Sequence, residues 1–264
     1  MGKIIAIIPA RFNSKRLPGK LLKMVNGKTI LNYTFSQVKK SSLIEDIFIA
    51  TDNEDILIEV KNFGGKPILT SPDHKSGSDR IAEALDKIEE EIGETVEIIV
   101  NVQGDEPLIS PSTIDETIKV LVKNRDVSIS TACVEIKNFE ELFDINVVKV
   151  VLDREGNALF FSRLPIPFYR KGVNDMCDFQ EKAKKNRILL KNYYKHIGIY
   201  VYRREFLKIF VNTEPTFLEK MEGLEQLRII ENGYKIKVVE TAFDSLGIDT
   251  ERDFEKFRKM IEEI

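Results

Sequence analysis

The chain has 264 residues, of which 42% are hydrophobic and 9% aromatic, so it can bury a full core and is not a disordered segment. Its 40 basic and 43 acidic side chains leave a net charge of -3, which argues against a surface that coats nucleic acid. Cys133 and Cys177 form no C-x-x-C motif, and no apolar run approaches the roughly 20 residues that a membrane span needs. The first strand begins at once, without a signal leader. These features predict a soluble, cytoplasmic protein with reduced thiols.

The first half of the chain alternates strands and helices. Four strands are expected, over residues 4–8, 46–51, 67–69 and 96–102. Four helices are expected, over residues 27–40, 55–63, 79–91 and 113–123. Pro9 should end the first strand, because proline cannot donate to the ladder. Alternation of this kind predicts an α/β fold with parallel strands and right-handed crossovers.

The second half has a different pattern. Strands with short connections are expected over residues 128–136, 147–153 and 158–161, which suggests antiparallel additions to the sheet. Further elements are strands over residues 196–202 and 235–240 and helices over residues 222–231 and 250–263. Residues 172–191 are polar and poorly periodic, so we expect a long surface excursion near the substrate or at a subunit contact. Residues 1–264 show no repeat or linker and are expected to form one domain.

Basic side chains directly follow the first strand. One loop holds four basic residues, Arg11, Lys15, Arg16 and Lys20, and Pro18-Gly19 shapes its exit. A buried strand that runs into such a loop is how an open α/β sheet presents an anion site at its carboxyl edge, and the expected ligand is a polyphosphate. The chain contains neither G-x-G-x-x-G nor G-x-x-x-x-G-K-[ST], so side-chain cations must carry more of the binding than backbone amides. The competing interpretation is a solvated basic turn.

Two carboxylates follow the strand over residues 96–102. Asp105 and Glu106 lie where a charge contributes little to solubility, and oxygen ligands of this kind suit Mg²⁺. Asp249 has a similar setting just before Thr250, at the start of the last helix. Taken alone, Asp249 is better explained as a helix-capping residue. Together with Asp105 and the basic loop, it makes a two-aspartate metal site plausible.

Other polar residues have a structural and a functional interpretation. Ser76 and Arg80 stand at a helix start, where amide groups favour anions but where capping is equally expected. Gln103 has the donor and acceptor that suit a pyrimidine edge, or it satisfies a loop backbone. Arg163 follows a strand and could hold a carboxylate in a bidentate way. His196 has only His74 as a companion, so an imidazole metal cluster is excluded.

Nine short stretches occur in order along the chain. They are IPARFNSKRLPGK (8–20), ATD (50–52), HKSGSDR (74–80), NVQGDEPLI (101–109), NVVKVV (146–151), FSRLPIP (161–167), HIGIY (196–200), LEQLR (224–228) and GIDT (247–250). Together they resemble the 3-deoxy-manno-octulosonate (KDO) cytidylyltransferase family, also called CMP-KDO synthetases, over essentially the whole chain. One such stretch would be weak evidence, whereas nine in register are specific.

The resemblance implies a fold, an activity and an assembly. The fold is that of nucleotide-diphospho-sugar transferases, with a mostly parallel sheet flanked by helices, and the protein is usually a homodimer. The activity is Mg²⁺-dependent transfer of CMP from CTP to the anomeric 2-hydroxyl of KDO, with loss of pyrophosphate, for lipopolysaccharide assembly. Residues at about 126–204 would form the portion for substrate and dimerisation. No side chain is an obvious general base, so activation of the hydroxyl by the metal is the simplest expectation.

The resemblance also implies a role for each matched residue. The CTP triphosphate would lie on Arg11, Arg16 and Lys20. The nucleoside would meet Ser76, Arg80 and Gln103. Asp105 and Asp249 would hold Mg²⁺ and, with Arg16 and Lys20, form the catalytic set. The sugar acid would be surrounded by Arg163, His196, Tyr200, Glu225 and Gln226, the last two of which would otherwise be interpreted as an ordinary polar helix face.

The chain departs from the family pattern at several places. Ser78 stands where the family usually has Thr, Asp144-Ile145 replaces Asn-Pro, and Ser245-Leu246 replaces Pro-Val. Residues 172–191 also look unlike the common pattern. These departures leave the nucleotide chemistry intact and keep other sugar acids open, such as 8-amino-KDO or a nonulosonate. A non-catalytic nucleotide-binding regulator on the same scaffold is the rival from another functional class.

Overall fold

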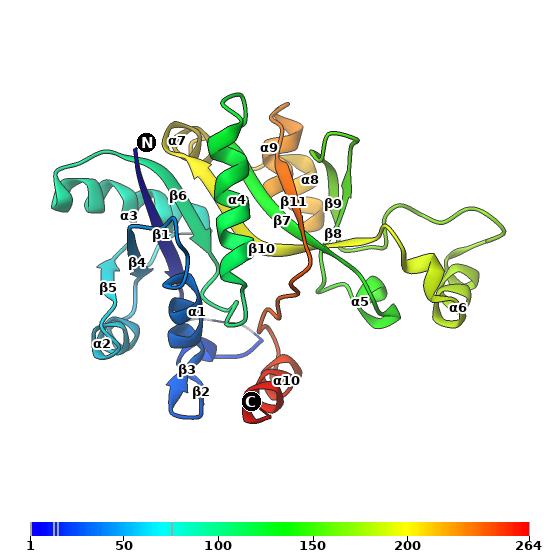
Figure 1. Ribbon diagram of the computed structural model, residues 1–264, viewed down its shortest axis with the longest axis horizontal. Coiled ribbons are helices and arrows are strands. Elements are labelled where there is room, and N and C mark those ends of the chain that lie inside the picture. The colour runs from blue at the N-terminus through cyan, green and yellow to red at the C-terminus, as the bar shows by residue number, and fades with distance from the viewer. Residues whose placement is uncertain (1, 13, 15, 75, 264) are drawn as a thin grey trace.

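A mixed β-sheet forms the centre of the molecule in the computed structural model, which describes residues 2–12, 14, 16–74 and 76–263 (Figure 1). The strand order is β11-β7-β10-β6-β1-β4-β5, and the hairpin β8–β9 extends it beside β10. The strands are β1 (Lys3–Ala10), β4 (Asp46–Thr51), β5 (Lys66–Leu69), β6 (Val96–Val102), β7 (Ile129–Glu135), β8 (Lys149–Leu152), β9 (Ala158–Ser162), β10 (Tyr194–Arg203) and β11 (Lys237–Thr241). A separate ribbon pairs β2 (Met24–Val25) with β3 (Lys28–Thr29).

The strand directions follow the sequence prediction. β1 is parallel to β4 and β6, and β4 is parallel to β5. β10 is antiparallel to β6 and β7, and β8 is antiparallel to β9 and β10. β11 runs parallel to β7. The sheet is therefore parallel in its first half and acquires antiparallel members in its second, as the short connections indicated.

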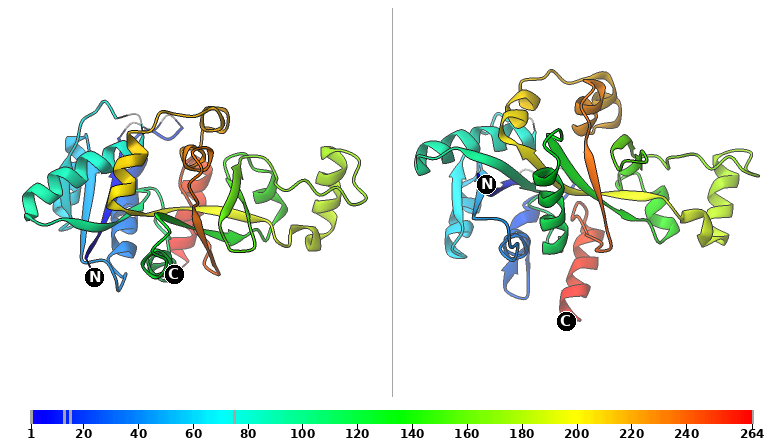
Figure 2. Two further views of the ribbon diagram at one scale, coloured as in Figure 1. Left: turned by 90° about the horizontal axis from the view of Figure 1, so that it is seen from above. Right: turned by 45° about the horizontal axis from the view of Figure 1, so that its top comes forward.

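Helices cover both faces of the sheet (Figures 1 and 2). Side chains of β1 alternate between two cores: Ile4 and Ile8 lie in one, Ile5 and Ile7 in the other. The first core is closed by α1 (Ile30–Val38), α2 (Glu54–Asn62), α4 (Pro111–Lys123) and α10 (Glu251–Glu262). The second is closed by α3 (Gly77–Ile92), α7 (Arg204–Val211) and α9 (Gln226–Glu231). The result is a three-layer α/β arrangement.

Pro9 does not end the first strand, contrary to the prediction. β1 continues to Ala10, and Pro9 pairs in register with Ala50 of β4. The ladder from β1 to β6 stops earlier, at Ile7, and the carbonyl of Pro9 faces Gly104 on that side. The missing N–H of Pro9 therefore falls where no ladder partner is needed, which is why proline is tolerated there.

The helices also differ from the prediction in several places. The helix expected over 27–40 begins at Ile30, because Thr29 caps it and the preceding residues form the β2–β3 ribbon. The helix expected over 222–231 is two helices, α8 (Phe217–Glu222) and α9. They are separated by Gly223, whose φ of 63° favours glycine and ends α8. The short helices α5 (Phe139–Phe143) and α7 were not foreseen.

Residues 172–191 are more ordered than a polar surface excursion. They contain α6 (Met176–Lys185) and the 3₁₀ helix η2 (Arg187–Leu190). Phe179 is fully buried against Phe143 and Tyr193, in a small third core that also includes residues of α5. The segment stands at the end of the molecule opposite β5 (Figures 1 and 2). Its few apolar residues were hidden by the many charged side chains of α6.

The strand order places a crevice at one edge of the sheet. β1 connects to β4 on one side, while the chain later returns to place β6 on the other side of β1. In open α/β sheets, ligands bind beyond the carboxyl ends of the strands where the order reverses in this way. Over the part of the chain that the structure describes, no helix is both long and apolar enough to cross a membrane.

Candidate active site

Three adjoining cavities open at the carboxyl edge of β1 and β6. The first, here called the loop cavity, measures about 240 Å³ and is lined by residues that include Arg11, Lys20, Gln103 and Asp105. The sheet cavity, about 340 Å³, shares Gln103 with it. The outer cavity, about 580 Å³, is lined in part by α10. The sheet cavity shares Gly77, Gln103 and Glu225 with the loop cavity, and Val148, His196 and Gly198 with the outer cavity.

Lys20 joins two carboxylates from distant parts of the chain. Its ammonium donates to Asp105 and, over 2.9 Å, to Oδ1 of Asp249. The chain can turn toward them because Gly19 adopts a φ of 64° just before the 3₁₀ helix η1 (Lys20–Leu22). Burial would lower the pKa of Lys20, but the two carboxylates outweigh it, and the net shift is upward. The ammonium stays charged and joins Asp105 in the loop cavity to Asp249, which lines the outer cavity.

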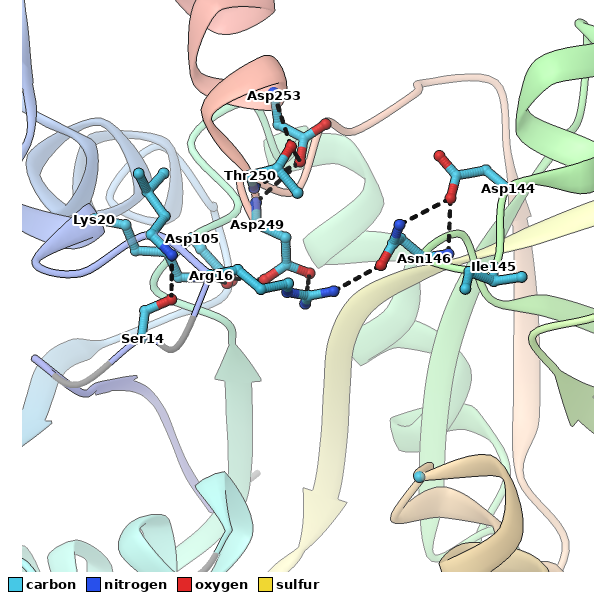
Figure 3. Close-up of polar contacts among 12 residues, drawn as sticks. Ser14, Arg16, Lys20, Asp105, Asp144, Ile145, Asn146, Asp249, Thr250 and Asp253 are labelled. Carbon is cyan, nitrogen blue, oxygen red and sulfur yellow. Dashed lines mark hydrogen bonds and ion pairs between the residues drawn. The ribbon is translucent and has the colours of Figure 1, made fainter.

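Asp249 is free of the capping role that its sequence position suggested. Thr250 caps α10: its hydroxyl accepts from the Asp253 amide, and the Asp253 carboxylate accepts in return from the Thr250 amide (Figure 3). The backbone N–H of Ile248 donates to the carbonyl of Asp105 over 2.9 Å, which ties the two aspartate loops together. Burial raises the pKa of Asp249, but Lys20 and Arg16 lower it further, so the carboxylate is held ionised.

Arg16 lies between Asp249 and the loop before β8 (Figure 3). Its guanidinium is 2.8 Å from Oδ2 of Asp249 and donates over 2.6 Å to Oδ1 of Asn146. Arg11 lines the loop cavity and has a pKa lowered by burial and by the neighbouring Arg80. Lys15, which the sequence places in the same basic loop, lies outside the described residues.

The donor set at this edge suits a magnesium ion that arrives with a ligand. Asp105 and Asp249 offer carboxylate oxygens, the ligands that Mg²⁺ prefers. Within residues 2–12, 14, 16–74 and 76–263, no group of three or more His, Cys, Asp or Glu side chains could hold a metal ion. This does not conflict with Mg²⁺, which is usually bound through one or two carboxylates plus substrate phosphates and waters.

Two of the residues expected at the nucleoside have structural partners here. Ser76 is the N-cap of α3, where it accepts from the Asp79 amide over 3.1 Å, although it also lines the loop cavity. Arg80 is fully buried, and its guanidinium donates to Asp52 over 2.9 Å and to the Thr70 hydroxyl. The structure therefore does not bring Arg80 to the cavity surface, and the ion pair with Asp52 explains an arginine near the start of a helix.

Gln103 lies at the junction of the loop and sheet cavities. Its backbone N–H donates to the Gly198 carbonyl over 3.2 Å, and its side-chain amide donates over 3.2 Å to Asn101. The backbone bond fixes the residue, and the side-chain oxygen lies near Gly77 at the start of α3. Gln103 thus lines both cavities and retains the donor and acceptor groups of an amide.

His196 is a partly buried, neutral imidazole in the wall of the sheet cavity. The hydroxyl of Thr131 donates to the carbonyl of Ile199 over 2.6 Å and lies 2.8 Å from Nε2 of His196. Because that hydroxyl proton is already used, Nε2 must carry a proton and donate, which leaves Nδ1 as an acceptor. Burial lowers the pKa of His196 to about 3.

The remaining residues expected around a sugar acid also line the sheet cavity. The ring of Tyr200 packs against that of His196 at a tilt of 39°, and burial raises the pKa of Tyr200 well above its usual value. Glu225 accepts from the Ser78 hydroxyl over 2.9 Å, and burial raises its pKa. Gln226 is buried at the start of α9. The guanidinium of Arg163 lies at the same cavity and donates to the carbonyl of Glu222 over 2.8 Å. The structure therefore brings all five together.

Several residues at the site were not singled out from the sequence. Asn146 accepts a hydrogen bond from Arg16. It begins the stretch NVVKVV (146–151), but no role of its own was expected for it from the sequence. Glu106, which the sequence did single out beside Asp105, accepts from Ser245 and lies so close to Gly198 and Gly247 that an added Cβ would meet its Oε1 at 2.8 and 3.2 Å. Burial raises the pKa of Glu106 to about 7. Lys149, a fully buried lysine between two valines, was not singled out either, although its apolar neighbours in the sequence indicate a buried charge.

Comparisons with known proteins agree with this geometry. A family model described as Cytidylyltransferase matches residues 5–236. The 3-deoxy-manno-octulosonate cytidylyltransferase of Geotalea daltonii is 47% identical over 96% of both chains. A solved structure of CMP:2-keto-3-deoxy-manno-octonic acid synthetase complexed with CTP is 34% identical, with a TM-score of 0.84 over 99% of both chains. The 4-diphosphocytidyl-2C-methyl-D-erythritol synthase of Anaerococcus prevotii, at 15% identity, has a TM-score of 0.61 over 99% of this chain and 96% of its own. The predicted fold is confirmed.

The partly buried imidazole gives a testable pH dependence of stability. In the unfolded chain a histidine has a pKa near 6.5, whereas that of His196 in the folded chain is about 3. Below pH 6.5 the unfolded state binds a proton that the folded state does not, so the free energy of unfolding falls by about 1.4 kcal/mol per pH unit from this residue. His196→Gln should show a shallower loss between pH 7 and 4.5 in chemical denaturation.

A second histidine supplies the control. His74→Gln, at a partly exposed imidazole beside Glu83, should keep the steep wild-type dependence. Equal slopes in the wild type and His196→Gln would contradict the assignment of a partly buried, neutral imidazole.

Proposed function

The chain belongs to the 3-deoxy-manno-octulosonate cytidylyltransferase family, and on that premise we propose that it transfers a cytidylyl group from CTP to KDO. The anomeric hydroxyl oxygen of KDO forms a bond to the α-phosphorus of CTP. The bond between that phosphorus and the oxygen bridging to the β-phosphate breaks, and the hydroxyl proton is lost. The products are CMP-KDO, used in lipopolysaccharide biosynthesis, and pyrophosphate.

The observation that carries the proposal is the meeting of Lys20 with Asp105 and Asp249. A reaction between two anions needs cations to bring them together and to stabilise the charge that builds up on the leaving group. Lys20 and Arg11 line the loop cavity, and Arg16 lies beside Asp249. We assign the triphosphate to these three side chains, with Lys20 exchanging carboxylate partners for phosphate oxygens.

We assign Mg²⁺ to Asp105 and Asp249. Their oxygens fit a hard cation that brings phosphate and water as its other ligands. When bound, the ion would neutralise phosphate charge and favour ionisation of the attacking hydroxyl. The protein's own part is to hold the two aspartate loops together, through the bond from the Ile248 amide to the Asp105 carbonyl.

The sugar acid is assigned to the sheet cavity. Arg163 supplies a guanidinium with five N–H donors, of which three donate to main-chain carbonyls. Nδ1 of His196 can accept from a sugar hydroxyl, since Nε2 donates to Thr131. Glu225 and Gln226 offer polar atoms at the far wall, beside Tyr200. The cytosine is assigned to the Gln103 side of the loop cavity. Arg80 does not line that cavity, so it would act on the nucleotide only indirectly, through its ion pair with Asp52 and its charge near Arg11.

We further propose a homodimer in the cytoplasm, with residues 126–204 contributing to the contact. Leu164, Phe168 and Ile188 in this portion are exposed apolar side chains. The part of it with β8, β9, α5 and α6 projects from the rest of the molecule, where a second copy has access to it (Figures 1 and 2). Burying such side chains against a partner would be favourable.

A panel of sugar acids tests the function directly. The protein is incubated with Mg²⁺-CTP and KDO, 8-amino-KDO or a nonulosonate, and pyrophosphate release is measured. KDO should give the highest kcat/KM. A higher kcat/KM with another acid would reassign the substrate, and CTP binding without pyrophosphate release from any acid would make the protein a regulator instead.

Asp105→Asn tests the two-aspartate site. The substitution keeps the shape of the side chain and removes its charge, so the melting temperature should change little. Turnover should fall by at least on the order of 100-fold, which corresponds to about 2.7 kcal/mol in the barrier. Asp115→Asn, at a carboxylate that is bonded to Ser41 and Ser42 and lines none of the three cavities, is the control and should keep the wild-type rate. A near-normal rate in Asp105→Asn would overturn the metal assignment.

A further inference from the structure

Lys149 is a fully buried lysine in β8. A charge in this position needs hydrogen-bond partners, because burying an unpaired ammonium is very unfavourable. Its ammonium donates to three main-chain carbonyls: that of Asp144 over 2.9 Å, that of Val147 over 2.6 Å and that of Arg163 over 2.5 Å. A lysine ammonium has three N–H groups, so each has one acceptor.

The three carbonyls belong to two segments that meet at the site. One segment is the loop over residues 144–147, whose Asn146 accepts from Arg16. The other contains Arg163, whose guanidinium lies at the sheet cavity. Nη1 of Arg163 also donates to the carbonyl of Ile145, over 3.1 Å, inside the same loop. Lys149 therefore fixes both the backbone of Arg163 and the loop that receives its guanidinium.

The charges that face Lys149 come from several elements. Burial is the main cause that lowers its pKa, to about 8; Asp144 and Glu222 oppose the shift and Arg163 adds to it. Lys195 lies directly opposite in β10, but its ammonium is paired with Glu141 over 2.9 Å and with Asp244 over 2.6 Å. The ammonium of Lys149 is thus held by carbonyl dipoles and not by a carboxylate.

We propose that Lys149 is a positioning residue for the sugar acid: by holding three carbonyls, it sets the guanidinium of Arg163 at the sheet cavity. This rests on the proposed function, in which Arg163 binds the sugar acid. A protonated lysine donates to all three carbonyls. A neutral amine keeps two N–H groups and turns a lone pair toward the third carbonyl, which loosens one of the two segments.

Lys149→Met separates this role from simple packing, since methionine fills a similar volume without the donors. At pH 7 the KM for the sugar acid should rise about tenfold, while kcat and the KM for CTP should stay within about threefold of wild type. Between pH 7 and 9 the wild-type KM for the sugar acid should rise as Lys149 loses its proton. The ratio of variant to wild-type KM should therefore shrink from about tenfold toward about twofold.

Arg204→Leu is the control for lost stability. It removes an ion pair with Glu89 between α7 and α3, away from the three cavities, and should leave both KM values unchanged. If Lys149→Met keeps the wild-type KM for the sugar acid at pH 7, or if the ratio of the two KM values does not change with pH, the inference is overturned. The proposed function would still hold in that case, provided that the wild type turns over KDO. Failure of the wild type to release pyrophosphate with KDO would instead remove the proposed function and, with it, this role.

Discussion

The ammonium of Lys20 between Asp105 and Asp249 is the interaction on which the site depends. Two carboxylates at the edge of a sheet repel each other, and burying them without partners would be costly. Lys20 offsets both effects before any ligand arrives. The fold supplies the three positions: β1 leads into the basic loop, β6 ends before Asp105, and the segment after β11 crosses to bring Asp249 beside it. One ammonium and two carboxylates are thus brought together from three distant parts of the chain.

Much of the fold could be predicted because its signals are local. The strands β4 and β6 were expected with the bounds that the structure shows, since unbroken aliphatic runs mark buried parallel strands. The basic loop and Asp105 could be expected at the carboxyl edge because each follows a buried strand, whereas Asp249 taken alone was interpreted as a capping residue. Pro9 was misjudged because its effect depends on which neighbour the missing N–H would face. The split between α8 and α9 depends on the single positive φ of Gly223.

The parts of the site that escaped prediction share a physical cause. Arg80 and Lys149 are held by a distant carboxylate and by main-chain carbonyls, and such partners leave no spacing pattern in a sequence. Glu106 was noticed beside Asp105, but its close packing against Gly198 and Gly247 is a tertiary contact that the sequence does not show. Residues 172–191 gave the wrong impression because their apolar side chains form a small separate core under a charged surface. Tertiary partners, not composition, decide what these residues do.

The affinity for Mg²⁺-CTP of Lys20→Ala, compared with that of Lys23→Ala, tests the central claim most directly. Lys23 is the matched control, since it follows closely in the chain and pairs with Glu251 outside the loop cavity. In titration calorimetry at saturating Mg²⁺, the dissociation constant for CTP should rise at least about tenfold in Lys20→Ala, a loss of about 1.4 kcal/mol in binding free energy. Lys23→Ala should keep a dissociation constant near that of the wild type. Equal affinity for CTP in Lys20→Ala and the wild type would contradict the account.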